Sequence, residues 1–262
     1  MLRFFAPLFF SFSIAFADSV YCLRAPRSGS HFMFYCLNEI FDINIVSSKA
    51  DRRFQHPFFP KKGGPNLYVA HNAANLQLDK ESFDSDYLIC LVRNYRENYI
   101  RRYETLPRIL KQLRFEARWR SKESPHFNLE KLSEFNQDHY FHCLRCYDLW
   151  DPDKRILIYY EDLIERPKMV MEELAQFFQM DNYEEILDQF MRDLPDHKER
   201  SLALYNHNYE SKTQTDGKDL SSHSKRLGSK AAASIDFAVM TLFPDYFDRY
   251  LLRFKRPTPP SQ

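Results

Sequence analysis

Glycine is scarce in this sequence, with five residues among 262, whereas an average protein carries about 7%. Collagen, flexible Gly/Ser linkers and the glycine-rich loop of Rossmann folds all need more glycine, or closer spacing, than this chain offers. The five are Gly29, Gly63, Gly64, Gly217 and Gly228. A site in which the backbone approaches a phosphate therefore has few positions to use.

The sequence also lacks an excess of either charge, because 37 lysines and arginines face 36 aspartates and glutamates. We therefore expect no nucleic-acid partner, and any anion site must be local. Hydrophobic residues make up 44% of the chain and aromatics 16%. Such a composition can fill a core, which excludes disorder as a description of the whole chain.

The N-terminus has the features of a secretory signal. Arg3 precedes an uncharged run, residues 4–17, that ends in Ala-Phe-Ala, a small-x-small cleavage pattern. Because the run is shorter than the about 20 residues of a spanning helix, we expect no stable membrane span. We expect residues 1–17 to be cleaved and the protein to be exported to a secreted, periplasmic or lumenal location. A first element of the fold and an uncleaved membrane anchor are the alternatives.

The cysteine count is odd, and two cysteines lie inside apolar, strand-like runs. This pattern does not predict a disulfide framework, and at most one or two bridges can form. The cysteines are Cys22, Cys36, Cys90, Cys143 and Cys146.

Apolar runs alternate with segments of helical spacing along the chain. Uncharged or β-branched runs predict strands at 19–23, 67–70, 87–92 and 155–160. Helical spacing of apolar residues occurs within 32–41 and 167–191. We also expect a helix rich in arginine and tyrosine after Arg93, a polar helical stretch at about 106–150 and a final helix at about 229–243. Buried strands that alternate with helices predict an α/β fold of three layers, α/β/α, around a mostly parallel sheet. We expect one domain over 18–255 and a proline-rich tail at 256–262.

The loop after the first predicted strand has the sequence PRSGSH, residues 26–31, and leads into a helix. The N–H groups and positive dipole of a helix start make such a turn a candidate anion site. Gly29 would let a phosphate approach the backbone, and Ser28 and Ser30 offer hydroxyl donors. Ser30 occupies the lysine position of a Walker A loop, which disfavours an ordinary ATP- or GTP-hydrolysing site. A plain turn with a helix cap is the alternative.

Three motifs in order resemble the sulfotransferase family that uses 3′-phosphoadenosine 5′-phosphosulfate (PAPS). The family's Pro-Lys/Arg-Ser-Gly-Thr/Ser loop is matched at 26–30, and its Arg-Asn-Pro-x-Asp/Glu strand end by residues 93–97, with Tyr95 in the proline position. Its Tyr-Glu-Asp-Leu segment is matched at 160–163, with Pro167 following. The resemblance implies a P-loop NTPase-like fold and in-line transfer of a sulfuryl group from PAPS to a hydroxyl acceptor, without a metal.

The resemblance also implies roles around the 5′ end of the donor. Arg27 stands in place of the family's loop lysine and would bind the leaving phosphate or the sulfuryl oxygens, although arginine cannot donate a proton as lysine can. The N–H groups and hydroxyls of residues 28–30 would hold the 5′-phosphate, with His31 next in the loop. Phe32 stands where the family often has a tryptophan that stacks on adenine.

For the rest of the nucleotide, the resemblance implies that Arg93 clamps the 3′-phosphate and that Tyr160 approaches the adenine edge. The family's second 3′-phosphate residue, a serine, falls on Arg101, which can itself bind phosphate. The family's C-terminal Arg-Lys-Gly element has no clear copy. Loose candidates, which also suit a solvated loop, are Lys218, Lys225 and Arg226.

His71 is the candidate catalytic base. Many family members carry a catalytic histidine within Lys-Thr-His after the donor loop, and residues 68–71 keep the histidine but lose the lysine. An imidazole with a pKa near 6.5 suits a base at neutral pH; a surface or capping histidine is the alternative. The missing lysine motivates a second hypothesis, a secreted non-catalytic binding or effector protein on a decayed sulfotransferase scaffold. A kinase-like phosphotransferase lacks both the Walker lysine and a credible Mg²⁺ aspartate.

Four metal-ligand residue types fall at i, i+3, i+4 and i+7, which would put them on one face of a helix. They are His139, His142, Cys143 and Cys146. Such a set could bind Zn²⁺, but one helix rarely supplies four tetrahedral ligands, so we expect a packed helix face and no metal site. The acceptor pocket would be built by residues 49–65 and 106–150, where no motif identifies the acceptor.

Overall fold

A parallel sheet organises the fold. The computed structural model describes residues 20–25, 28–46, 59–70, 86–122, 140–208 and 227–254. In this part of the chain, all neighbouring strands of the sheet run parallel, in the order β2-β3-β1-β4-β5. The strands are β1 (Val20–Arg24), β2 (Asn44–Val46), β3 (Asn66–Ala70), β4 (Tyr87–Val92) and β5 (Arg155–Tyr159).

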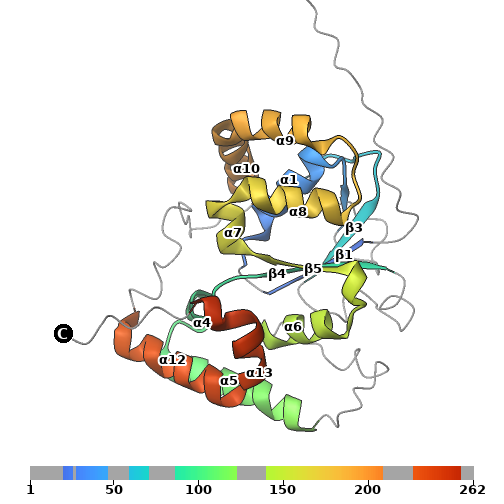
Figure 1. Cartoon of the computed structure of the whole chain (residues 1–262). Coiled ribbons are helices and arrows are strands. Elements are labelled where there is room, and N and C mark those ends of the chain that lie inside the picture. Colours follow the sequence, from blue (N-terminus) through green and yellow to red (C-terminus); the bar gives the residue numbers. More distant parts are fainter. Residues whose placement is uncertain are drawn as a thin grey trace, which may run out of the picture.

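Helices cover both faces of the sheet (Figure 1). The α1 layer consists of α1 (Ser30–Ile40), α7 (Tyr160–Glu165), α8 (Pro167–Phe177), α9 (Tyr183–Arg192) and α10 (Leu194–Asn208). The α4 layer consists of α4 (Tyr95–Tyr103), α5 (Leu106–Lys122), α6 (Tyr140–Leu149), α12 (Ser229–Leu242), α13 (Pro244–Tyr246), η3 (Phe247–Leu251) and η4 (Leu252–Phe254). A short turn, η2 (Pro152–Lys154), precedes β5. The predicted three-layer α/β/α architecture is confirmed.

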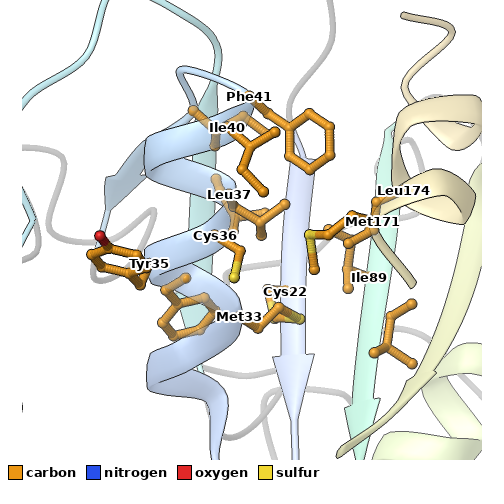
Figure 2. Packing of buried hydrophobic residues seen from close by; sticks show 14 of the residues in the cluster. Cys22, Met33, Tyr35, Cys36, Leu37, Ile40, Phe41, Ile89, Met171 and Leu174 are labelled. Atoms are coloured by element: carbon orange, nitrogen blue, oxygen red, sulfur yellow. The ribbon is translucent and has the colours of Figure 1, made fainter. Parts of the chain in front are cut away.

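The strands feed two separate cores because successive side chains of a strand point to opposite faces. Tyr21 and Leu23 of β1 pack in the α4 layer, whereas Val20 and Cys22 pack in the α1 layer. Figure 2 shows part of the second core, with side chains of α1 and α8 packed around Cys22. Burial on both faces explains why these strands are continuous apolar runs.

All five cysteines lie among the described residues, and each is buried without forming a disulfide. Burial raises the pKa of Cys22, against the opposing charge of Arg24, and that of Cys146 to about 12. Cys143 and Cys146 belong to the core of the α4 layer, in agreement with the packed-face alternative. His139 lies outside the described residues, among which no three potential metal ligands come together.

Three differences from the predicted elements matter for the site. The sequence prediction missed β2, which has three residues, and α10, whose apolar residues do not gather strongly on one face. The described parts of the predicted helical stretch at 106–150 are helical and form α5 and α6. The last predicted strand ends at Tyr159, because Tyr160 opens α7, whose first turn carries Glu161 and Asp162. Acidic residues are favourable at a helix N-terminus.

A buried arginine connects α4 to the C-terminal part of the fold. Arg96 forms a salt bridge with Asp236 of α12, and its Nη1 donates to the carbonyl of Phe254 at 2.6 Å. The hydroxyl of Tyr95 donates to the same carboxylate at 2.7 Å. These bonds fix α4, the helix that follows the β4 strand end. No helix among the described residues is both long and apolar enough to cross a bilayer.

Candidate active site

The carboxyl ends of three neighbouring strands meet at one edge of the sheet. Arg24 at the end of β1 is in register with Leu91 of β4, and Val92 at the end of β4 with Tyr159 of β5. In open α/β sheets, ligands bind outside this edge. The segments that follow the three strands contain most of the site residues predicted from the sequence.

Gly29 and Tyr160 are in direct contact across this edge. Gly29 has φ 71° and is the N-cap of α1, and a left-handed conformation favours glycine. A Cβ on residue 29 would lie 2.6 Å from Cδ2 and 2.8 Å from Cζ of Tyr160, and closer still to Cε2. Both the backbone angle and the packing of the tyrosine ring therefore require glycine here.

The two serines beside Gly29 differ in how their groups are used. The N–H of Ser28 donates to the carbonyl of Ala25 at 3.2 Å, so this N–H is not part of the predicted phosphate cradle. The hydroxyl of Ser28 is buried and has no hydrogen-bond partner among the residues that the structure describes. The hydroxyl of Ser30 accepts a hydrogen bond from Arg24 and can still donate its own proton. The start of α1 has no side-chain cap, which leaves its first N–H groups for an anion.

Arg93 directly follows β4 and is almost fully buried, with 3% of its surface exposed. Its guanidinium lies 4.7 Å from the ring centroid of Tyr160. The backbone around it is held from two sides. The hydroxyl of Tyr140 donates to the carbonyl of Arg93 at 2.6 Å, and the N–H of Asn94 donates to Glu161 at 3.0 Å.

Arg101 of α4 belongs to the same group of charges. Burial raises the pKa of Tyr160, while the nearby charges of Arg93 and Arg101 oppose that rise. Tyr160 is therefore a neutral phenol flanked by two arginines. Together with Gly29, these residues form a cationic site that can hold an anionic ligand bearing a flat ring.

Two predicted site residues at the start of α1 make contacts within the α1 layer. His31 packs on the ring of Phe59, with ring centroids 5.1 Å apart, and is hydrogen-bonded to the backbone of Ser201 in α10. Burial, together with the charge of Arg24, lowers the pKa of His31 to about 4, so its imidazole is neutral at pH 7. Phe32 packs, partly buried, against the core of the α1 layer.

Several predicted residues lie outside the described part of the chain, and their roles stay predictions. They are Arg27, His71, Lys218, Lys225 and Arg226.

Sequence reasoning missed two supporting residues. Arg24 bonds Ser30 and lies 5.2 Å from the ring centroid of Phe34; a charged residue that ends an apolar strand was the available signal. Glu161 holds Asn94 and is part of the recognised Tyr-Glu-Asp-Leu segment. Burial raises the pKa of Glu161, although the hydrogen bond from Asn94 and the charge of Arg93 oppose this rise. Glu161 thus holds the backbone after β4, and Arg24 holds the hydroxyl of Ser30.

The next residue, Asp162, links α7 to the C-terminal turn. Arg253 donates to its carboxylate at 2.6 Å, and Arg166 bonds the same oxygen. Burial works against the charged form, but these two guanidinium groups prevail and lower the pKa of Asp162. Asp162 is therefore a stabilising carboxylate beneath the site.

We expect Asp162→Asn to reduce the free energy of unfolding by about 1 kcal/mol at neutral pH. The folded pKa of Asp162 lies below that of the unfolded chain, near 3.9. Its contribution is therefore present above about pH 4 and is lost as the pH falls through the folded value. The measurement is urea unfolding of wild type and variant from neutral to acidic pH. The difference between their free energies of unfolding should become smaller as the pH falls. Asp188→Asn is the control, since the salt bridge of Asp188 with Lys168 is exposed. A stability difference between wild type and Asp162→Asn that increased toward acidic pH would contradict the expectation.

The comparisons with known proteins agree on one family. The Sulfotransferase domain model matches residues 25–251, and no curated protein matches the chain. The solved structure of the mouse sulfotransferase SULT7A1, complexed with PAP, superposes with a TM-score of 0.56 at 13% identity, over 90% of this chain and 88% of that one. A sulfotransferase from Alicyclobacillus acidocaldarius gives a TM-score of 0.38 at 13% identity, over 71% and 95% of the two chains. The first of these superpositions shows that the fold is similar to that of the mouse sulfotransferase.

Proposed function

This chain belongs to the sulfotransferase family, and we propose that it transfers a sulfuryl group from PAPS to the hydroxyl of an acceptor by in-line displacement. One observation carries the proposal: Gly29, Arg93 and Tyr160, predicted from three separate motifs, lie together at the carboxyl edge of the sheet. PAP, the desulfated product of PAPS, is bound by the similar mouse sulfotransferase.

The residues of the site fit the two ends of such a donor. On one side, the partnerless buried hydroxyl of Ser28, the bare backbone of Gly29 and the uncapped start of α1 suit a 5′-phosphate. On the other, Arg93 and Arg101 suit a 3′-phosphate, because guanidinium groups bind phosphate through paired N–H donors. Tyr160 lies between them and would face the adenine.

Sulfuryl transfer makes three demands on the protein. It must hold the donor, neutralise the charge that grows on the leaving phosphate and take a proton from the acceptor hydroxyl. PAPS, when bound, supplies the sulfuryl group. We assign the neutralising charge to Arg27 and the proton acceptance to His71, because the imidazole of histidine is the side chain best suited to act as a base at neutral pH.

We expect Arg27→Ala to lower the transfer of label from PAPS at least tenfold, because the leaving phosphate loses a fixed positive charge. Arg27→Lys introduces the lysine that the family's loop carries at this position, and this variant should keep most of the activity. The measurement is transfer of ³⁵S from PAPS to a panel of alcohols, phenols and sugars. Full transfer by Arg27→Ala would refute the assigned role.

Calorimetry with PAP separates this proposal from the hypothesis of a non-catalytic scaffold. A folded protein that binds PAP and transfers label is the expected result. A folded protein that neither binds PAP nor transfers label would favour the decayed scaffold, for which the missing lysine before His71 and the arginine at position 101 are the motivating features.

A further inference from the structure

The outer face of α5 carries exposed positive charge. The helix has six basic residues and a single acidic one, Glu116. Glu116 is buried, where it accepts hydrogen bonds from Gln112 and from the N–H of Phe141. Three of the basic side chains, those of Arg108, Lys111 and Arg114, are exposed, and among the described residues none of the three has a carboxylate partner. In a chain whose charges nearly cancel, this helix is a local concentration of positive charge.

The neighbouring helix, α12, exposes apolar side chains. Phe237 is 73% exposed and Met240 is 40% exposed. The acidic residue of this helix, Asp236, is held by Arg96. The exposed part of the Phe237 side chain contributes no apolar burial to the stability of the fold. Its burial against a binding partner would be favourable. α12 therefore presents apolar surface, and its one carboxylate, that of Asp236, is paired with Arg96.

The two helices are adjacent, since α12 packs against α5 in the α4 layer (Figure 1). We define the α5–α12 face as Arg108, Lys111, Arg114, Phe237 and Met240. It lies on the side of the sheet away from α9 and α10. Charge and apolar area thus occur on one side of the molecule, remote from the exposed helices of the α1 layer.

We propose that the α5–α12 face binds an anionic lipid surface, with the basic side chains at the headgroups and Phe237 inserted among the acyl chains. Basic residues near such a surface contribute additively, and interfacial binding combines this attraction with burial of aromatic and aliphatic side chains. A soluble polyanion would use the same charges, but it offers no apolar phase for Phe237 and Met240. The exposed apolar pair therefore favours a lipid surface. This inference is independent of the proposed sulfuryl transfer.

The test is co-sedimentation of the full chain with vesicles. Vesicles of phosphatidylcholine alone are compared with vesicles that contain about one third phosphatidylglycerol, at low and at high salt. We expect binding to the anionic vesicles that weakens with salt. The simultaneous changes Arg108→Gln, Lys111→Gln and Arg114→Gln should weaken it at least tenfold. Phosphatidylcholine vesicles report any contribution of the apolar residues 4–17, which does not depend on lipid charge.

A matched triple variant controls for the loss of three charges. Lys61→Gln, Arg192→Gln and Lys198→Gln remove three exposed basic side chains from elsewhere on the protein and should leave vesicle binding nearly unchanged. Circular dichroism confirms that both triple variants are folded. Equal loss of binding in the two triple variants would overturn the proposal, because binding would then follow net charge alone.

A second variant distinguishes a lipid surface from a soluble polyanion. Phe237→Ser should lower binding to anionic vesicles several-fold and leave binding to heparin, the polyanion probe, unchanged. The proposal would be overturned if the protein bound heparin but not anionic vesicles. It would also be overturned if Phe237→Ser left binding to anionic vesicles unchanged. Since Phe237 is exposed in the folded protein, the substitution is not expected to affect folding.

Discussion

Gly29→Ala is expected to lower the affinity for PAP about a thousandfold and to abolish detectable sulfuryl transfer. Two costs combine. A left-handed backbone costs an alanine about 1–2 kcal/mol, and the new Cβ overlaps the ring of Tyr160. Relief of that overlap must move a largely buried side chain, at about 1–3 kcal/mol. Because Tyr160 is in contact with Arg93, its displacement also disturbs the second half of the site. Isothermal titration with PAP measures the effect.

Gly63→Ala is the matched control. A Cβ at that position would meet only a carboxylate oxygen of Asp42, at 3.6 Å, an ordinary contact distance. The variant should bind PAP like the wild type. The double variant Gly29→Ala, Tyr160→Ala removes the overlap but keeps the strained backbone angle, so its stability should recover in part. Undiminished PAP affinity in Gly29→Ala would contradict the placement of a phosphate at this loop.

Arg93→Ala is expected to lower PAP affinity several hundred-fold, because loss of one partner of a buried charge pair costs about 2–5 kcal/mol. The selective readout is adenosine 5′-phosphate, which lacks the 3′-phosphate. The wild type should prefer PAP strongly, and Arg93→Ala should lose most of that preference. Titration of both nucleotides against wild type and variant gives the ratio directly.

Two neighbouring arginines of α4 provide the comparison. Arg101→Ala should also reduce the preference for PAP, since Arg101 acts on Tyr160. The guanidinium of Arg102 lies instead over the ring of Tyr103, 5.3 Å from its centroid, so Arg102→Ala should leave the preference intact. If Arg93→Ala weakened PAP and adenosine 5′-phosphate equally, the 3′-phosphate would not be the group that Arg93 binds.

The strands were predictable because burial on two faces leaves a strong signal in sequence. β1 and β4 are runs of apolar residues without an internal charge, and their predicted positions agree with the structure to within one residue. β2 has three residues, too few for any periodicity. The helix α7 escaped prediction because its six residues show no apolar repeat, and only the acidic pair in its first turn indicates where it begins.

Site residues could be predicted where a short sequence motif identifies them. They could not be predicted where packing between distant parts of the chain determines the position of the side chain. Gly29, Arg93 and Tyr160 each belong to a recognisable segment, and the parallel sheet brings these segments together. His31 belongs to the same loop motif, yet its ring packs on Phe59 and the backbone of α10. No local sequence pattern predicts the contact between His31 and α10, because α10 lies more than 160 residues further along the chain. The hydrogen bond from the hydroxyl of Tyr140 to the carbonyl of Arg93 likewise joins residues that are far apart in the sequence.

The division of the core into two layers has a consequence for how the protein can be redesigned. The α1 layer supplies Gly29 and Tyr160, the α4 layer supplies Arg101, and the sheet separates the two sets of packed side chains. Substitutions in separate cores affect stability almost additively. The helices of the α4 layer, including the outer surfaces of α5 and α12, can therefore be redesigned with little effect on the stability that packing of the α1 layer contributes.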